Sequence, residues 1–295
     1  MGRQHFPTKE VITIPKVSIK HDESKNPVVI LCVSLGYYCL LCKQNNLSGK
    51  DEKEFSYVLG SENGPEKWGE IHPEWALCKS GEMQSPIDLL DERRVAVGTH
   101  LGKLKRSYKP TNTTILNRGH DIMLRWVGGA GTIQINNTVY ELKQCHWHSP
   151  SEHTFNGKRF ALELHMVHES ADKKVAVVGV TYTIGRPDTF LSELMDHIGP
   201  IVFTDNEERG VGILDPRHIK IGSRKYYRYV GSLTVPPCTE NVVWTMVQKV
   251  RTVSREQVRL LRAAVKDESK TNARPIQPIK KHSVHLFRPT DAGSN

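Results

Sequence analysis

This chain of 295 residues has few cysteines and no long apolar run, and each scarcity excludes a class of protein. Six cysteines are too few for a miniprotein held together by disulfides, so a hydrophobic core must supply most of the stability. The uncharged apolar run at 28–42 is shorter than the roughly 20 residues of a spanning helix. With 38% hydrophobic and 25% charged residues, the composition is that of a globular protein and excludes a collagen-like or polytopic membrane chain.

Negative charge is also in deficit. The chain has 41 Lys plus Arg against 32 Asp plus Glu, which gives a formal charge of +9. The basic clusters at 103–106 and 280–281 are short and widely spaced, and stacking aromatics are not interleaved with them. We therefore expect no nucleic-acid partner. A solvated basic surface that favours at most weak contact with polyanions is the simpler interpretation.

The N-terminal region differs in composition from the rest of the chain. Residues 1–26 are polar and contain Pro7 and Pro15, which predicts a disordered extension. Residues 27–45 contain the apolar run, whose length suits a signal peptide or an uncleaved signal anchor. No stable membrane span is expected in the mature form. At the other end, residues 289–295 are predicted to be a flexible tail.

Three N-glycosylation sequons also fit export from the cytosol. They begin at Asn46, Asn112 and Asn136. We therefore expect a secreted or endomembrane-routed protein, and a plastid destination by that route stays open. The compartment would be oxidising.

Residues 51–288 are predicted to form one domain of short strands and turns with two clear helices. Leu191, Leu194 and Ile198 recur at helical spacing after Pro187. A second helix is predicted from Ser254, which forms a capping box with Gln257.

The chemistry-bearing residues lie on two predicted strands. In 160–167 apolar side chains alternate with a face that carries Glu163 and His165. In 144–148 Gln144, His146 and His148 share one face if the segment is extended. Two histidines on one strand and a third on its neighbour can hold a metal ion through neutral imidazoles. A fourth position is then left for water, whose pKa zinc lowers to near neutrality.

The residues that precede two of these ligands can orient them. Gln144 and Glu163 each stand two residues before a histidine on the same face, so each can bond the ring nitrogen that faces away from the metal. His153 and His168 are out of phase with the ligands, and we interpret them as buried, hydrogen-bonded structural residues.

Further motifs occur in a fixed order around the two strands: NGPEKW (63–68), QSPID (84–88), NRGH (117–120), SLTVPPC (232–238) and NARPIQP (272–278). The series resembles the alpha-class carbonic anhydrases, and most of all their plant, secreted branch with its dioscorin and nectarin relatives. The resemblance implies a mainly β (α+β) fold, with a large twisted, mostly antiparallel sheet and short peripheral helices.

The resemblance also implies roles for individual residues. It makes His146, His148 and His165 the ligands of Zn²⁺, supported by Gln144 and Glu163. Thr234 would accept a hydrogen bond from the nucleophile and donate its own hydroxyl to Glu152, which positions the nucleophile without removing its proton. His120 would be the proton shuttle, since a side chain with an ordinary pKa near 6.5 can relay protons to buffer.

Two more groups of residues are assigned by the resemblance alone. The apolar wall where carbon dioxide waits would consist of Val167, Val177, Leu233, Val242 and Trp244. Cys78 and Cys238 fall where extracytoplasmic family members have a disulfide, which leaves Cys145 unpaired.

The implied activity is zinc-dependent, reversible hydration of carbon dioxide to bicarbonate and a proton. Two alternatives stay open at this point. One is a non-catalytic storage or binding protein on the same scaffold. The other is a cupin, because His146-x-His148-x-x-x-Glu152 also resembles the first cupin motif, with Glu152 as a ligand of iron or manganese. The glycine spacing is wrong for a cupin, and no second cupin motif follows. The sequence does not indicate the oligomeric state.

Overall fold

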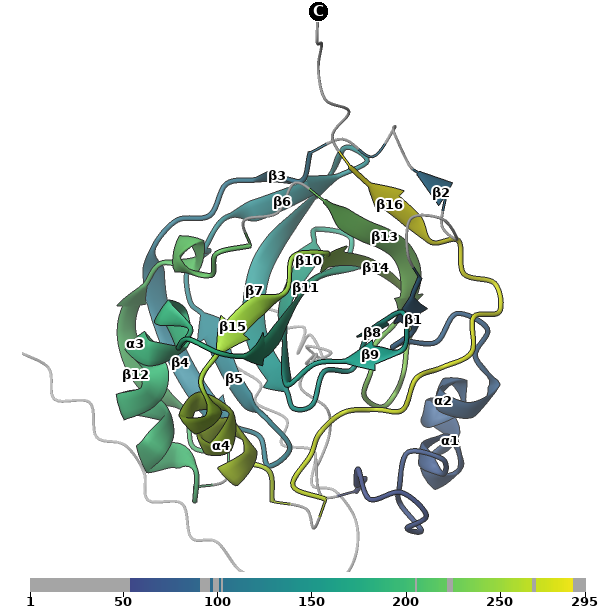
Figure 1. Cartoon of the computed structure of the whole chain (residues 1–295), viewed down its shortest axis with the longest axis horizontal. Helices are drawn as coiled ribbons and strands as arrows, with labels where there is room; N and C mark the ends of the chain where they lie inside the picture. The colour runs from purple at the N-terminus through teal and green to yellow at the C-terminus, as the bar shows by residue number, and fades with distance from the viewer. Residues whose placement is uncertain are drawn as a thin grey trace, which may run out of the picture. The chain divides into compact units, whose positions relative to one another are not determined.

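The computed structural model describes residues 54–90, 96–97, 101, 103–204, 206–221, 225–266 and 269–288 (Figure 1). The predicted extension at 1–26, the hydrophobic segment at 27–45, the sequon at Asn46 and the tail at 289–295 lie outside these residues. None of the described helices is long and apolar enough to cross a membrane.

A 13-stranded sheet dominates the fold, and its main path runs β12-β4-β5-β7-β10-β11-β14-β13-β16-β2. Most neighbouring strands are antiparallel, whereas β14 and β15 both run parallel to β11, and β2 runs parallel to β16. A separate small sheet has the order β1-β8-β9. The prediction of a mainly β fold with a large, mostly antiparallel sheet is confirmed.

The strands of the first half are β1 (Asp88–Leu89), β2 (Ala96–Val97), β3 (Lys105–Arg106), β4 (Thr111–Asn117), β5 (Ile122–Trp126), β6 (Thr132–Ile135), β7 (Thr138–His148), β8 (Thr154–Phe155) and β9 (Lys158–Arg159). Those that follow are β10 (Leu162–Ser170), β11 (Val175–Ile184), β12 (Arg209–Leu214), β13 (Tyr226–Ser232), β14 (Glu240–Val247), β15 (Arg251–Val253) and β16 (His285–Phe287).

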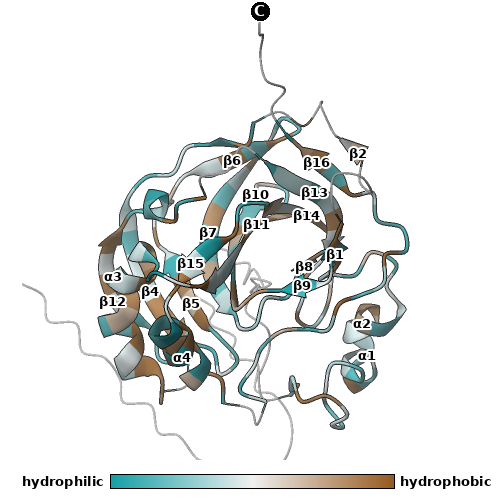
Figure 2. Cartoon of the chain, viewed as in Figure 1, coloured by the Kyte–Doolittle hydropathy of each residue, from teal (hydrophilic) through white to brown (hydrophobic). Residues whose placement is uncertain are grey.

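The two predicted helices are present as α3 (Thr189–Ile198) and α4 (Arg255–Ala263), which lie on one side of the sheet in Figure 1. The Asp188 side chain caps α3 by accepting a hydrogen bond from the Leu191 N–H. The predicted capping box of α4 is formed, because Ser254 and Gln257 bond each other's backbone N–H groups. The outer face of α4 is polar, as its colour in Figure 2 shows.

Short peripheral helices were predicted by the resemblance, but their positions were not. They are α1 (Trp68–Ile71), η1 (Pro73–Trp75), α2 (Leu77–Ser80), η3 (Gly199–Ile201) and η4 (Pro216–His218). A helix of three or four residues completes at most one turn, so it leaves no periodic pattern in the sequence.

The alternation along β10 divides its side chains between two apolar clusters. Leu162, Leu164 and Met166 join a large cluster that includes buried residues of α3 and α4. Val167 joins a second cluster with residues of β11, β13 and β14. His165 shares a strand face with Val167, so the histidine face of β10 borders the second cluster.

The predicted disulfide is also present. Cys78 of α2 is bonded to Cys238, which lies in the turn before β14. Both belong to a third cluster, which contains Trp68 and Trp75. Cys145 is a buried free cysteine.

Candidate metal centre

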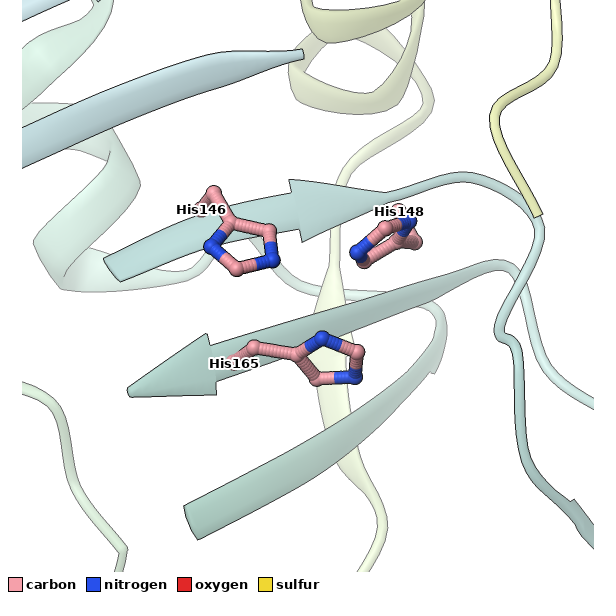
Figure 3. Close-up of side chains that lie close together, drawn as sticks. All are labelled: His146, His148 and His165. Atoms are coloured by element: carbon pink, nitrogen blue, oxygen red, sulfur yellow. The ribbon is translucent and has the colours of Figure 1, made fainter. Parts of the chain in front are cut away.

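Three histidines from adjacent strands converge in the structure (Figure 3). His146 and His148 come from β7, and His165 of β10 stands directly opposite His146 in the strand register. One ring nitrogen of each lies within 4.8 Å of the corresponding atoms of the other two. His148 and His165 are almost completely buried, so water competes little for these nitrogens.

The other nitrogen of each ring is bonded to a protein acceptor. His146 Nδ1 is 2.9 Å from Gln144 Oε1, as the strand alternation predicted. His165 Nε2 is 2.7 Å from a carboxylate oxygen of Glu163, and His148 Nδ1 is 2.6 Å from the Asn272 carbonyl oxygen. Because these acceptors fix the N–H of each ring, the lone pairs are assigned to His146 Nε2, His148 Nε2 and His165 Nδ1.

Burial favours the neutral form of His146 and His165. Burial, together with the neighbouring His148, lowers the pKa of both His146 and His165. Burial by itself would raise the pKa of Glu163, but its interactions with His153 and His165 hold that pKa well below its usual value. Neutral imidazoles beside an ionised carboxylate are the state in which histidines bind metals.

The donor set fits a zinc ion. His148 Nε2 is buried and has no hydrogen-bond partner among the described residues, which is costly unless a ligand satisfies it. Three imidazoles are the ligand set of zinc enzymes that keep the fourth position open. Glu152 faces the N–H sides of the rings, because its carboxylate lies 3.5 Å from His148 Nδ1 and 4.0 Å from His165 Nε2. The residues present therefore suit Zn²⁺ better than iron or manganese held by a carboxylate.

Glu152 is completely buried beside the histidines. One of its oxygens, Oε1, accepts a hydrogen bond of 2.9 Å from the Arg274 backbone N–H. The other oxygen, Oε2, has no partner in the described part of the chain. Thr234 is buried in the turn that follows β13. Among the described residues no hydrogen bond joins Thr234 to Glu152, so the expected pair is not formed here.

His153 contacts the site directly, although the strand alternation did not place it among the ligands. It is buried and hydrogen-bonded, as expected, but its main partner is Glu163. Its Nδ1 lies 2.7 Å from one oxygen of that carboxylate, and its backbone N–H donates to the other. His153 Nε2 is 2.6 Å from the Tyr229 hydroxyl. His153 therefore holds the carboxylate that orients His165.

His120 lies in the turn between β4 and β5, and only 8% of its surface is exposed. Its ring packs against Phe55, with ring centres 4.6 Å apart. Arg118 and Asp121 form an ion pair across the turn, and the Asn272 side chain donates a hydrogen bond to the His120 carbonyl oxygen. The turn is thus held on both sides of the histidine.

The residues expected to form the apolar wall lie together. Val167, Val177, Val242 and Trp244 belong to the second cluster, and Leu233 packs against it. The Trp244 ring centre is 4.8 Å from that of His165, so this cluster directly borders the histidines.

Two supporting residues were missed by sequence analysis. Besides its contact with His148, Asn272 accepts a hydrogen bond from the Ser149 N–H and donates to the Trp147 carbonyl oxygen. The buried Arg274 guanidinium donates to Gln84 and to the carbonyl oxygens of Ser85 and Cys78. The motif at 272–278 was the available signal, but it assigned neither residue a role.

Comparisons with known proteins agree on one family. A family model described as eukaryotic-type carbonic anhydrase matches residues 63–288. Alpha carbonic anhydrase 7 of Arabidopsis thaliana is 60% identical over 240 residues, which cover 81% of this chain and 87% of the relative. Dioscorin dioA3 of Dioscorea japonica is 46% identical and covers 88% of this chain and 93% of its own length. The crystal structure of dioscorin complexed with ascorbate superposes with a TM-score of 0.78 at 46% identity, over 81% of this chain and 100% of that one.

Proposed function

Because the chain belongs to the eukaryotic-type carbonic anhydrase family, as its motifs predicted, we propose that it catalyses the reversible hydration of carbon dioxide to bicarbonate and a proton. The observation that carries this proposal is the convergence of three buried histidine nitrogens, backed by Gln144, Glu163 and the Asn272 carbonyl. His146, His148 and His165 would hold Zn²⁺. When bound there, zinc lowers the pKa of water and supplies a nucleophile at neutral pH.

Glu152 and Thr234 orient the reaction. The Arg274 N–H fixes one oxygen of Glu152, and the other oxygen is an unused buried acceptor. In the proposed mechanism the Thr234 hydroxyl donates a hydrogen bond to that oxygen. The Thr234 oxygen can then accept a hydrogen bond from the nucleophile, which is positioned and not deprotonated by this contact. This fixes the direction from which a water lone pair meets the carbon atom.

The apolar wall suits the substrate. Carbon dioxide has no net dipole, and the Val167, Val242 and Trp244 side chains offer it an apolar surface. Bicarbonate is charged and is not stabilised by this apolar surface, so it leaves the site more readily than carbon dioxide does.

His120 would remove the proton that the reaction releases. Imidazole accepts and gives protons near neutral pH, and the Asn272 contact holds its backbone at a fixed place in the turn. The ring packs against the rings of Phe55 and Tyr57.

We also propose that the protein is secreted or routed through the endomembrane system, with plastids as a possible destination. The Cys78–Cys238 disulfide supports this proposal, because such bonds persist in oxidising compartments. Asn112 of β4 and Asn136, in the turn between β6 and β7, are both exposed and could carry glycan.

The test is stopped-flow hydration of carbon dioxide by the full chain, refolded under oxidising conditions, with zinc measured in the same sample. We expect one zinc per chain, and activity that disappears on chelation and returns with zinc. His165→Ala should lose both zinc and activity. Thr234→Val should keep zinc and lose about 100-fold in rate. His197→Ala, on the outer part of α3, is the control and should behave as the parent.

A different result would favour the storage or binding alternative, the role for which dioscorin-like scaffolds provide the precedent. A folded chain that binds one zinc and shows no hydration above buffer would overturn the proposed activity. Retention of activity in the zinc-free chain would overturn the proposed role of the metal.

A further inference from the structure

A polar pocket of about 440 Å³ lies where three segments meet, and it contains none of the residues of the metal centre. The connection from β11 to α3 supplies Arg186 to Thr189, the segment after η4 supplies Lys220, and the β15 region supplies Lys249 to Thr252. Figure 1 shows β15 beside the connection between β11 and α3.

The pocket is strongly cationic. Four side chains that line it carry positive charge and one carries a carboxylate: Arg186, Lys220, Lys249, Arg251 and Asp188. In the described part of the chain, none of the four cations donates a side-chain hydrogen bond or forms an ion pair. Elsewhere on the described surface, cations such as Arg217 and Lys79 are paired with carboxylates. A concave surface that gathers unpaired cations attracts anions.

Asp188 interacts electrostatically with Arg251 and Lys220, but one carboxylate offsets only one of the four positive charges. The Asp188 side chain is turned toward α3, where it accepts the Leu191 N–H as the helix cap. Neutral donors supplement the cations. Thr189 and Thr252 also line the pocket, and each carries a hydroxyl group that can donate a hydrogen bond.

The pocket walls are held in place before any ligand arrives. The buried Gln257 side chain accepts from the Asp188 N–H at 2.9 Å and donates to the Asp188 carbonyl oxygen at 2.8 Å. Strand pairing fixes Arg251 opposite Tyr182 and Thr252 opposite Thr183. Because the backbone is already ordered, a ligand has to immobilise only the ends of the cationic side chains.

We propose that this pocket binds a small anion that carries two or more phosphate groups. Arginine and lysine together with hydroxyl donors suit tetrahedral phosphate oxygens, each of which accepts several charge-assisted bonds. At about 30 Å³ per water molecule, the volume exceeds what a single inorganic ion fills. The surplus of cations over carboxylate matches a ligand with at least three negative charges.

The test is calorimetric titration of inorganic pyrophosphate into the full chain in about 0.1 M salt, where nonspecific attraction is largely screened. We expect one site per chain with a dissociation constant below about 100 µM, and orthophosphate bound at least tenfold more weakly. Arg186→Gln and Arg251→Gln should each weaken binding about tenfold.

Two control variants make the result specific. Lys105→Gln removes an exposed cation of β3 and should leave the affinity unchanged. His146→Ala disrupts the metal centre and should also bind pyrophosphate like the parent. The proposal is overturned if no saturable binding occurs up to 1 mM, if orthophosphate binds equally well, or if the double variant of Arg186 and Arg251 keeps the affinity. Loss of binding in His146→Ala would instead assign the anion to the metal centre.

Discussion

At the scale of single residues, the candidate metal centre depends on acceptors that hold each imidazole in one tautomer. Gln144 supplies the acceptor for His146. Gln144→Ala should therefore weaken zinc affinity about tenfold, because the ring can then rotate and its N–H loses its partner. Competition with a chromophoric chelator measures the affinity. Gln134→Ala, on neighbouring β6, is the matched control. Equal affinity in Gln144→Ala and the parent would show that the glutamine does not support the ligand.

A second residue-scale prediction concerns pH. His168 is fully buried, and burial lowers its pKa to about 4. It lies 2.8 Å from the Tyr108 hydroxyl, which donates to the neutral ring. The unfolded chain takes up this proton near pH 6.5 and the folded chain does not. The contribution of His168 to the free energy of unfolding is therefore fully present above pH 6.5. It decreases as the pH drops toward 4, by up to about 3 kcal/mol.

His168→Gln preserves both hydrogen bonds without a titrating group. Urea unfolding between pH 7.5 and 5 should show a smaller loss of stability in this variant than in the parent. If the two free energies of unfolding change in parallel over that range, His168 is not the group responsible.

Some contacts of the candidate site could be predicted from the sequence and others could not. Strict alternation along two strands was enough to place Gln144 and Glu163 beside their histidines. Asn272 contacts His148 and Arg274 contacts Glu152 through backbone atoms, across 124 and 122 residues of sequence. Any residue except proline offers such a carbonyl and N–H, so side-chain chemistry gave no sign of these contacts.

At the scale of elements, the capping box of α4 links that helix to its neighbour. Ser254→Ala removes the acceptor of the Gln257 N–H and should destabilise the protein by about 1 kcal/mol. Urea unfolding measures the change. Arg259→Ala, at an exposed position of the same helix, should change stability by less than about 0.5 kcal/mol. Equal effects of the two substitutions would argue against a specific role for the cap.

Local signals predicted α3 and α4 but not the order of the strands. A helix with a cap and an apolar stripe can be identified within about ten residues. The parallel pairing of β11 with β14 joins segments far apart in the sequence, and it depends on the whole sheet. The two clusters on opposite faces of β10 follow from its alternation, yet the strands that cover each face could not be inferred from it.

At the scale of the whole molecule, the disulfide connects residues 160 positions apart. Closing so long a loop restricts the unfolded chain, and the chain-entropy estimate gives a stabilisation of roughly 5 kcal/mol. The Cys78→Ala and Cys238→Ala double variant should be less stable by an amount of this order in denaturant unfolding. Cys145→Ala is the control, because Cys145 forms no disulfide. If the double variant is as stable as the parent, the disulfide does not contribute to the free energy of unfolding.

The contact between Asn272 and His148 also implies that synthesis of the C-terminal segment precedes assembly of the histidine site. The ribosome adds 124 residues after His148 before the carbonyl that holds its ring exists. The N–H that fixes Glu152 is made later still. During synthesis the emerging chain therefore has three histidines without the segment that orients them. We expect metal capture to follow the completion of translation, so that zinc is acquired in the compartment where the finished chain folds.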